Sequence, residues 1–209
     1  MNITLVFFVS FLTTFLATLP PGLLNMTAAK ISLKENLTRG IMFSLGACFI
    51  IIFQALIATV FARYLTNHPD IIEILRIVAL VIFALLSIYF LFIAKSTEKE
   101  KKDVDVRSKT SRFFHGMFLS SINVFPIPFQ AYVAISLASF GLLEFHGIGV
   151  ASYVVGASSG AFSALYIYMI FFDKIKDRKI ASQKSMNYLI GLITGLVAIV
   201  TLFNILKDL

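Results

Sequence analysis

Six long apolar segments constrain the fold more than any other feature of this sequence. They cover residues 3–19, 40–61, 71–94, 113–140, 147–172 and 188–206. Each approaches or exceeds the roughly 20 residues that an α-helix needs to cross a hydrocarbon core about 30 Å thick. Because backbone groups in lipid must pair within the protein, we expect helices rather than open strands. The sequence therefore predicts an all-α, polytopic membrane protein with six transmembrane helices.

The composition agrees with a chain that folds in lipid. Hydrophobic residues make up 58% of the 209 residues, against about 45–50% in an average soluble domain. The net charge of +7 would favour nucleic-acid binding in a soluble protein. Here, however, the charges cluster in short loops between the apolar segments. We therefore expect the lipid bilayer, and no nucleic acid, as a partner. The single cysteine, Cys48, excludes an intrachain disulfide, a CxxC redox pair and a cysteine metal site.

The distribution of lysine and arginine predicts the orientation in the membrane. Of the 18 such residues, 15 follow the first, third and fifth apolar segments, whereas Arg63, Arg76 and Lys207 lie on the other side. Because basic loops stay in the cytoplasm, we expect a multi-pass protein of the bacterial inner membrane with both termini outside. The first segment lacks a basic n-region and a clear cleavage site, so it is interpreted as a retained helix, not a removed signal peptide.

One long polar linker, residues 95–112, divides the sequence into two halves. The first half is 1–94 and the second is 113–209, and each holds three apolar segments. Because three crossings is an odd number, the two halves would lie in the membrane in opposite orientations. In each half, a proline-interrupted segment precedes a glycine-bearing one. The sequence thus predicts two inverted three-helix repeats in which helices 1 and 4 are broken.

Prolines mark both breaks. Pro20-Pro21-Gly22 ends the first apolar segment, and NVFPIPFQ, residues 123–130, lies inside the fourth. Proline removes a backbone donor and clashes with the preceding turn, and backbone groups freed at membrane depth must be buried in protein or face water. The first break can also simply end its helix at the membrane surface, and the second can be a kink in a packing helix. Matched breaks in two halves nevertheless indicate a transporter's binding site.

The residues around the breaks are candidates for a substrate site. Amides, backbone carbonyls and half-helix ends can bind the charged groups of a zwitterion such as an amino acid. Gln54, in the middle of the second segment, can line a cavity or bond across to a neighbouring helix. The small residues of 156–164 indicate close helix packing. The predicted substrate-binding residues are Pro20, Pro21, Gly22, Asn25, Gln54, Asn123, Pro126, Pro128 and Gln130.

Signals for catalysis or metal binding are missing from the sequence. No acidic residue lies deep in an apolar segment, so a proton relay has no intramembrane carboxylate. The nearest titratable candidates are His115, Glu144 and His146, although residues of this kind are more often simply interfacial polar residues. There is no metal-ligand spacing, no pair of deep carboxylates and no phosphate-binding glycine loop. The sequence predicts no enzyme, no cofactor and no metal site.

The first half carries a short motif after its first segment. Pro21 and Gly22 are followed by Leu23 and Asn25, and glycines open the second segment at Gly40 and Gly46. With the six-segment layout, this resembles the LysE/RhtB family of bacterial amino-acid exporters. Members carry a proline-glycine-proline motif there, often followed by an asparagine, so Leu23 replaces the second proline.

In the second half, Gly116 is similar to a glycine that members of that family often carry. Asn123 is similar to the asparagine of an asparagine-proline-lysine run that follows this glycine in the family. Here Val124 follows the asparagine, and Pro126 lies three residues beyond it. The resemblance implies efflux of amino acids or related small metabolites, driven by a proton or ion gradient. A related branch transfers electrons through paired membrane cysteines, and the lone Cys48 argues against that branch.

The sequence therefore favours a secondary transporter that exports a small molecule, such as an amino acid, by alternating access at a midplane site. The main alternative is a non-transporting membrane assembly or sensor subunit, which needs no cavity. A membrane enzyme that acts on lipid is the third interpretation. A homo-oligomer is compatible with all three. The region 23–39 can dip back into lipid or lie along its surface.

Overall fold

The structure is a computed structural model. It describes residues 2–20, 22–68, 87–93 and 108–174 and single helical positions at 71, 77, 80, 81, 84, 85, 195, 199, 202 and 206. The chain divides into two compact units, 1–66 with 103–177 and 67–102 with 178–209. The predicted third and sixth apolar segments belong to the second unit and lie largely outside the described residues, apart from a π-helix at Tyr89–Ile93.

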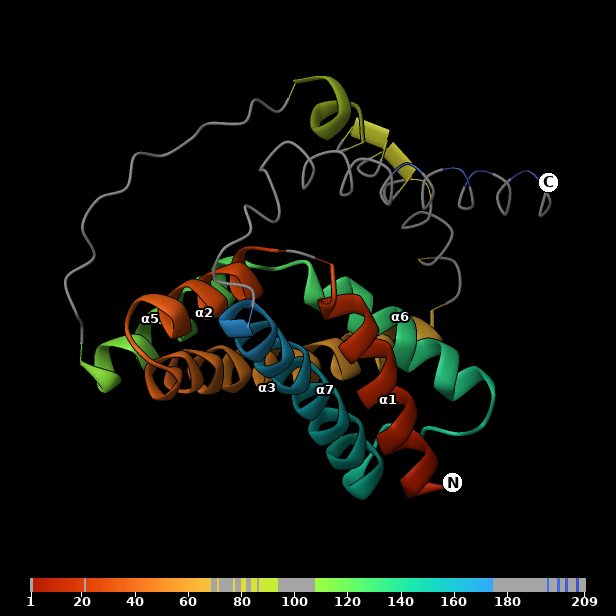
Figure 1. Ribbon diagram of the computed structural model, residues 1–209. Coiled ribbons are helices and arrows are strands. Elements are labelled where there is room, and N and C mark those ends of the chain that lie inside the picture. The colour runs from red at the N-terminus through yellow and green to blue at the C-terminus, as the bar shows by residue number, and fades with distance from the viewer. Residues whose placement is uncertain are drawn as a thin grey trace. The chain divides into compact units, whose positions relative to one another are not determined.

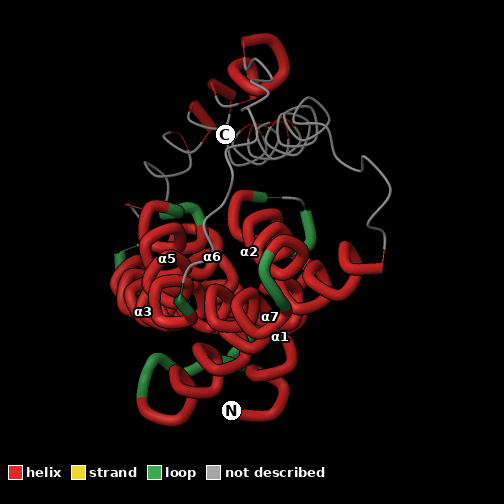
Figure 2. Tube along the Cα trace, turned by 60° about the vertical axis from the view of Figure 1, so that its left-hand side comes forward, coloured by secondary structure: helices red, strands yellow, loops and turns green. Residues whose placement is uncertain are grey.

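The first unit contains six α-helices, with the labels of Figure 1. They are α1 (Ile3–Thr18), α2 (Leu23–Lys34), α3 (Leu37–Thr66), α5 (Lys109–Ile122), α6 (Pro126–Ser139) and α7 (Gly147–Lys174). Figure 2 shows helices joined by short loops and no strand in the described part of the chain. The all-helical prediction is confirmed there.

Two helices, α3 and α7, are each long and apolar enough to cross a membrane. The pairs α1–α2 and α5–α6 also reach that length when each is taken together, and they are bent by 76° and 69°. The described residues thus hold two spans, or up to four if each bent pair is one span. Six spans stays a prediction.

The bends occur where the prolines are. α1 ends at Thr18, two residues before Pro20, and α2 begins after Gly22. In the second pair, Pro126 and Pro128 fall in the first turn of α6, where a missing N–H has no partner to lose. The predicted helix breaks at both places are confirmed. The segment from residue 23 onward, which the sequence left open, forms a helix whose Ala28 and Ile31 are buried. α5 already begins at Lys109, inside the predicted linker.

α1 and α7 run side by side in the same direction. Near their starts, the Ser152 hydroxyl donates to the Ile3 carbonyl at 2.7 Å. Further along both helices, Gly156 lies against the Phe7 carbonyl. Since the partner's number rises on both helices, the pair is parallel (Figure 1).

α3 and α5 form a second parallel pair. Gly46 lies against the Phe113 carbonyl, and Gln54 further along α3 reaches the Asn123 carbonyl just beyond α5. The corresponding contacts therefore recur: α1 packs on α7 as α5 packs on α3, and α2 packs on α7 as α6 packs on α3.

α3 and α7 run in opposite directions. Gly40, at the start of α3, lies next to Met169 near the end of α7. Cys48, further along α3, donates its thiol to the Ser158 carbonyl at 3.8 Å, earlier on α7. Consequently α1 and α7 share one direction, and α3 and α5 share the other.

These directions bring basic residues to one end of the first unit. α2 ends there, and α3 and α5 begin there. The charged residues at these helix ends are Arg39, Lys109 and Arg112 and the acidic Glu35. α7 ends there at Lys174. We call this the charged end; α1 and α7 begin at the opposite end.

Glycines allow both parallel pairs to touch backbone to backbone. A Cβ on Gly46 would overlap the backbone of Phe113, and one on Gly116 would overlap the backbone of Phe43. Gly156 and Gly160 meet the α1 backbone in the same way. The prediction that the small residues of 156–164 serve close packing is confirmed.

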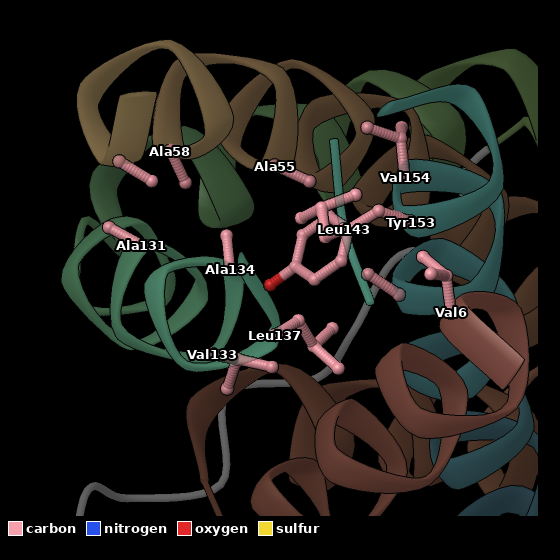
Figure 3. Packing of buried hydrophobic residues seen from close by; sticks show 12 residues of the cluster. Val6, Ala55, Ala58, Ala131, Val133, Ala134, Leu137, Leu143, Tyr153 and Val154 are labelled. Carbon is pink, nitrogen blue, oxygen red and sulfur yellow. The ribbon is translucent and has the colours of Figure 1, made fainter. Parts of the chain in front are cut away.

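The larger apolar core lies between α1, α3, α6 and α7. Figure 3 shows Tyr153, from α7, pointing toward α6 near Ala134 and Leu137. The alanines Ala55 and Ala58 of α3 are completely buried in the same cluster, so the helix backbones approach closely. This packing holds α6, and with it the second break, against α3.

Candidate functional site

The break between α1 and α2 is held by Asn25. Its Nδ2 donates to the carbonyls of Thr18 and Pro20, both at 2.9 Å. Its Oδ1 accepts from the Gly22 amide at 2.5 Å and the Met26 amide at 3.0 Å. Asn25 is 2% exposed. In this conformation the predicted substrate contact uses its amide to satisfy the backbone of the break, as buried polar groups require.

A second side chain reaches the same break from α7. The Tyr168 hydroxyl donates to the Leu19 carbonyl at 2.6 Å. Leu19 caps α1, and the last carbonyls of a helix have no partner within it. The long helix of the second half therefore stabilises the broken helix of the first.

Replacing Tyr168 with Phe tests this contact. We expect the free energy of unfolding in detergent to fall by about 1 kcal/mol, the usual net contribution of one hydrogen bond. Thermal unfolding is the measurement. Tyr166→Phe, two residues away on the same helix and 37% exposed, is the matched control and should change little. Equal losses in the two variants would contradict a specific role of the Tyr168 hydroxyl.

The break between α5 and α6 is held in a corresponding way by Gln54. Its Nε2 donates to the Ser120 carbonyl at 3.0 Å and the Asn123 carbonyl at 2.8 Å. Gln54 lies near the middle of α3 and is 4% exposed. The interpretation that Gln54 bonds across to a neighbouring helix is confirmed. Each break is thus capped by the long helix of the other half.

Two buried oxygen atoms at this second break have no hydrogen-bond partner among the residues that the structure describes. They are Gln54 Oε1 and Ser120 Oγ, and Ser120 is 1% exposed. A buried polar group left unpaired costs about 1–3 kcal/mol, so such groups in a native protein call for a ligand, a water or an ion. Both belong to residues joined by one hydrogen bond. They are two polar atoms that the second break can offer to a bound molecule.

Gln130, in the second turn of α6, connects three helices. Its Nε2 donates to Thr14 Oγ1 on α1 at 2.9 Å. The Tyr153 hydroxyl, on α7, donates to Gln130 Oε1 at 2.5 Å and lies 2.7 Å from the Gln130 carbonyl oxygen. Gln130 is 1% exposed. Gln130 thus joins the start of α6, which follows the second break, to the end of α1, which precedes the first break.

Sequence reasoning missed Thr14, Ser120, Tyr153 and Tyr168. A signal for two of them was present, because Thr14 and Ser120 each lie six residues before the first proline of their break. The other predicted residues lie at the breaks with different exposure. Pro20 and Pro128 are exposed, Gly22, Asn123 and Pro126 are partly buried, and Pro21 lies outside the described residues.

A second polar group lies at the charged end and was not predicted. The buried Arg112 pairs with Glu35, 77 residues away, and contacts His115 on its own helix. The sequence placed Glu35 outside the apolar segments, but its side chain is only 1% exposed. In the described part of the chain, no three His, Cys, Asp or Glu side chains gather as a metal site would need.

The model of one protein family, the LysE type translocator, matches residues 15–204, which include both breaks and the charged end. The chain belongs to the LysE type translocator family. No curated protein and no solved structure matches the chain. Membership makes the protein a membrane transporter, and the resemblance predicted from the proline-glycine motif and the six-segment layout is confirmed.

Proposed function

We propose that this translocator is a secondary transporter that exports amino acids or related small zwitterionic metabolites across the bacterial inner membrane. The observation that carries the proposal is the pair of buried, unpartnered oxygens, Gln54 Oε1 and Ser120 Oγ, at the second break. They lie beside the middle of a 30-residue membrane helix. A polar molecule has no water to bind in the hydrocarbon core of the membrane. It therefore needs polar protein atoms such as these two oxygens as hydrogen-bond partners there.

The two breaks suit the two charges of a zwitterion. α5 ends at Ile122, so its last carbonyls and the negative end of its dipole face the second break beside Gln54 and Ser120. This is where an ammonium group would bind. α2 begins at Leu23 at the first break, and the N-terminus of a helix favours a carboxylate. Gln130 and Thr14 keep the two regions together. Asn25 acts by fixing the shape of the first break.

Alternating access would come from two inverted repeats. The contacts support this, because α5 runs opposite to α1 although each is the first limb of a bent pair. Phe7 and Phe113 each lie 13 residues before the first proline of their break. Each presents its carbonyl to a glycine of the other half's long helix, Gly156 or Gly46. Rocking of one repeat against the other would expose the breaks to each side in turn.

The orientation follows from the charged end. Because Arg39, Lys109 and Arg112 lie there and α7 ends there at Lys174, we propose that this end faces the cytoplasm and that both termini lie outside. A reporter that is active only in the periplasm is expected to be silent when it is fused after Lys102. An active reporter at that position would reverse the proposed orientation.

The transport activity is tested with inverted membrane vesicles and a panel of labelled amino acids. We expect at least one to accumulate above the level of vesicles without the protein when an ion gradient is imposed. Asn123→Leu, which removes a partly buried amide at the second break, should lower the uptake about tenfold, as the loss of one hydrogen bond to substrate would. The exposed Phe118→Leu is the matched control (Phe118 is 62% exposed).

Failure of the whole panel would reject an amino-acid substrate. Unchanged uptake in Asn123→Leu would reject the second break as the site. A protein that supports no uptake of any kind, and whose cellular role survives Asn123→Leu, would instead be a non-transporting assembly or sensor subunit.

A further inference from the structure

A buried ionic group joins the two halves at the charged end. Arg112 of α5 is 3% exposed. Its Nε donates to Glu35 Oε2 at 3.1 Å, and its Nη2 pairs with Glu35 Oε1. Arg39 of α3 lies 3.7 Å from Glu35 Oε2. The end of α2 and the first turn of α5 are thus held together by one carboxylate between two guanidinium groups.

Neither partner is placed where its own helix would stabilise it. Arg112 lies in the first turn of α5, where the helix dipole disfavours a cation, and Glu35 caps the C-terminus of α2, where it disfavours an anion. Each charge therefore depends on the other. A buried pair of this kind is weak evidence for stability but is well suited to a switch, because removing one partner leaves an uncompensated charge.

His115 makes this pair sensitive to protons. Its Nδ1 lies 3.3 Å from Arg112 Nη1. Since arginine only donates hydrogen bonds, Nδ1 must accept, and His115 is neutral in this arrangement. In a protonated His115, Nδ1 carries a hydrogen, so it and Arg112 Nη1 would both be donors and could not form a hydrogen bond with each other. Protonation would also add a third positive charge beside Arg112 and Arg39, which already share the carboxylate of Glu35. On its other side, the His115 ring meets the ring of Phe43 edge to face.

The opposite end is closed by different chemistry. Counted back from the first proline of each break, the positions of Arg112 and His115 correspond to Val6 and Val9. Val6 is fully buried and Val9 packs against the same apolar cluster. The two ends thus have equivalent backbone positions, with ionic groups at one and apolar side chains at the other.

We propose that Glu35, Arg112 and His115 form a proton-responsive gate at the charged end. With His115 neutral, the Glu35–Arg112 pair holds α2 against α5 and the gate is closed. Protonation of His115 repels Arg112, weakens that contact and opens the path toward the second break. The role of the gate in transport rests on the proposed function, but its opening is measurable without any substrate.

The experiment measures thiol labelling behind the gate. In a Cys48→Ala background, Ser120→Cys places a single thiol about two turns deeper on α5 than Arg112. Lys109→Cys provides an exposed reference at the same end. The full-length protein in detergent is treated with a charged methanethiosulfonate reagent between about pH 8 and pH 5, the range in which histidine changes charge. Labelling of any thiol depends on pH, because the thiolate is the form that reacts. The ratio of the two labelling rates removes this dependence, which both positions share.

We expect this ratio to rise about tenfold on acidification, the effect of losing one charge-assisted hydrogen bond. In His115→Gln, which can still accept from Arg112 but carries no charge, the ratio should not change with pH. Glu35→Gln should give a high ratio at every pH. A ratio that does not depend on pH in the parent, or that depends on it equally in His115→Gln, would overturn the gate. Because the labelling experiment uses no substrate, its result does not depend on whether amino-acid uptake is observed.

Discussion

Gln54→Leu is expected to abolish transport and to destabilise the protein. The substitution introduces an apolar side chain of similar size but leaves the carbonyls of Ser120 and Asn123 without their donor. Each unpaired buried group costs about 1–3 kcal/mol, so the free energy of unfolding should fall by about 2–6 kcal/mol for the two carbonyls. Uptake should fall at least about 100-fold, because the variant also loses Oε1, one of the two unpartnered oxygens.

Two companion variants separate these effects. Phe53→Leu alters the neighbouring, exposed residue of α3 and should preserve both stability and uptake. Ser120→Ala removes the second unpartnered oxygen but no recorded hydrogen bond. It should therefore reduce uptake while leaving the thermal midpoint close to that of the parent. If Gln54→Leu transported at the parental rate, the second break would have no role in binding.

Gly46→Leu is expected to prevent assembly of the first unit. Even a Cβ at this position would overlap the backbone of Phe113, and backbone cannot move aside as a flexible side chain can. Overpacking in a tight core typically costs about 1–3 kcal/mol, and more where the backbone must shift. We expect little monodisperse protein after extraction in detergent, as measured by size-exclusion chromatography.

The neighbouring substitution Leu45→Ala is the control, because Leu45 is 43% exposed and faces away from this contact. Gly156→Leu should fail as Gly46→Leu does, since it meets the α1 backbone at Phe7. A well-folded Gly46→Leu protein would show that α3 and α5 do not pack as described.

The sequence predicted the features that depend on neighbouring residues. Pro20 and Pro126 determine the helix breaks directly, because each removes a donor and a turn where it stands. The start of α7 at Gly147 likewise agrees with the predicted segment. The length of an apolar segment and the position of a proline are local properties, and they can be read from one chain.

The contacts that shape the site are not local. Gln54 meets Asn123 across 69 residues, Glu35 meets Arg112 across 77, and Gln130 meets Thr14 across 116. A lone amide or hydroxyl in an apolar segment carries no indication of its partner. Glu35 also gave a misleading signal, because an acidic residue beside lysines and polar residues usually remains in water. Only the packing of α2 against α3 and α5 explains its burial.

The most direct test of the central claim is whether the second break is reached by water and by substrate. In the Cys48→Ala background, Asn123→Cys should react with a membrane-impermeant thiol reagent far faster than Phe118→Cys, which we expect to face lipid because Phe118 is 62% exposed on α5. A transported amino acid should slow the reaction at position 123 alone. If position 123 reacts no faster than position 118, and no candidate substrate changes its rate, then the break is a packed kink and not a binding site.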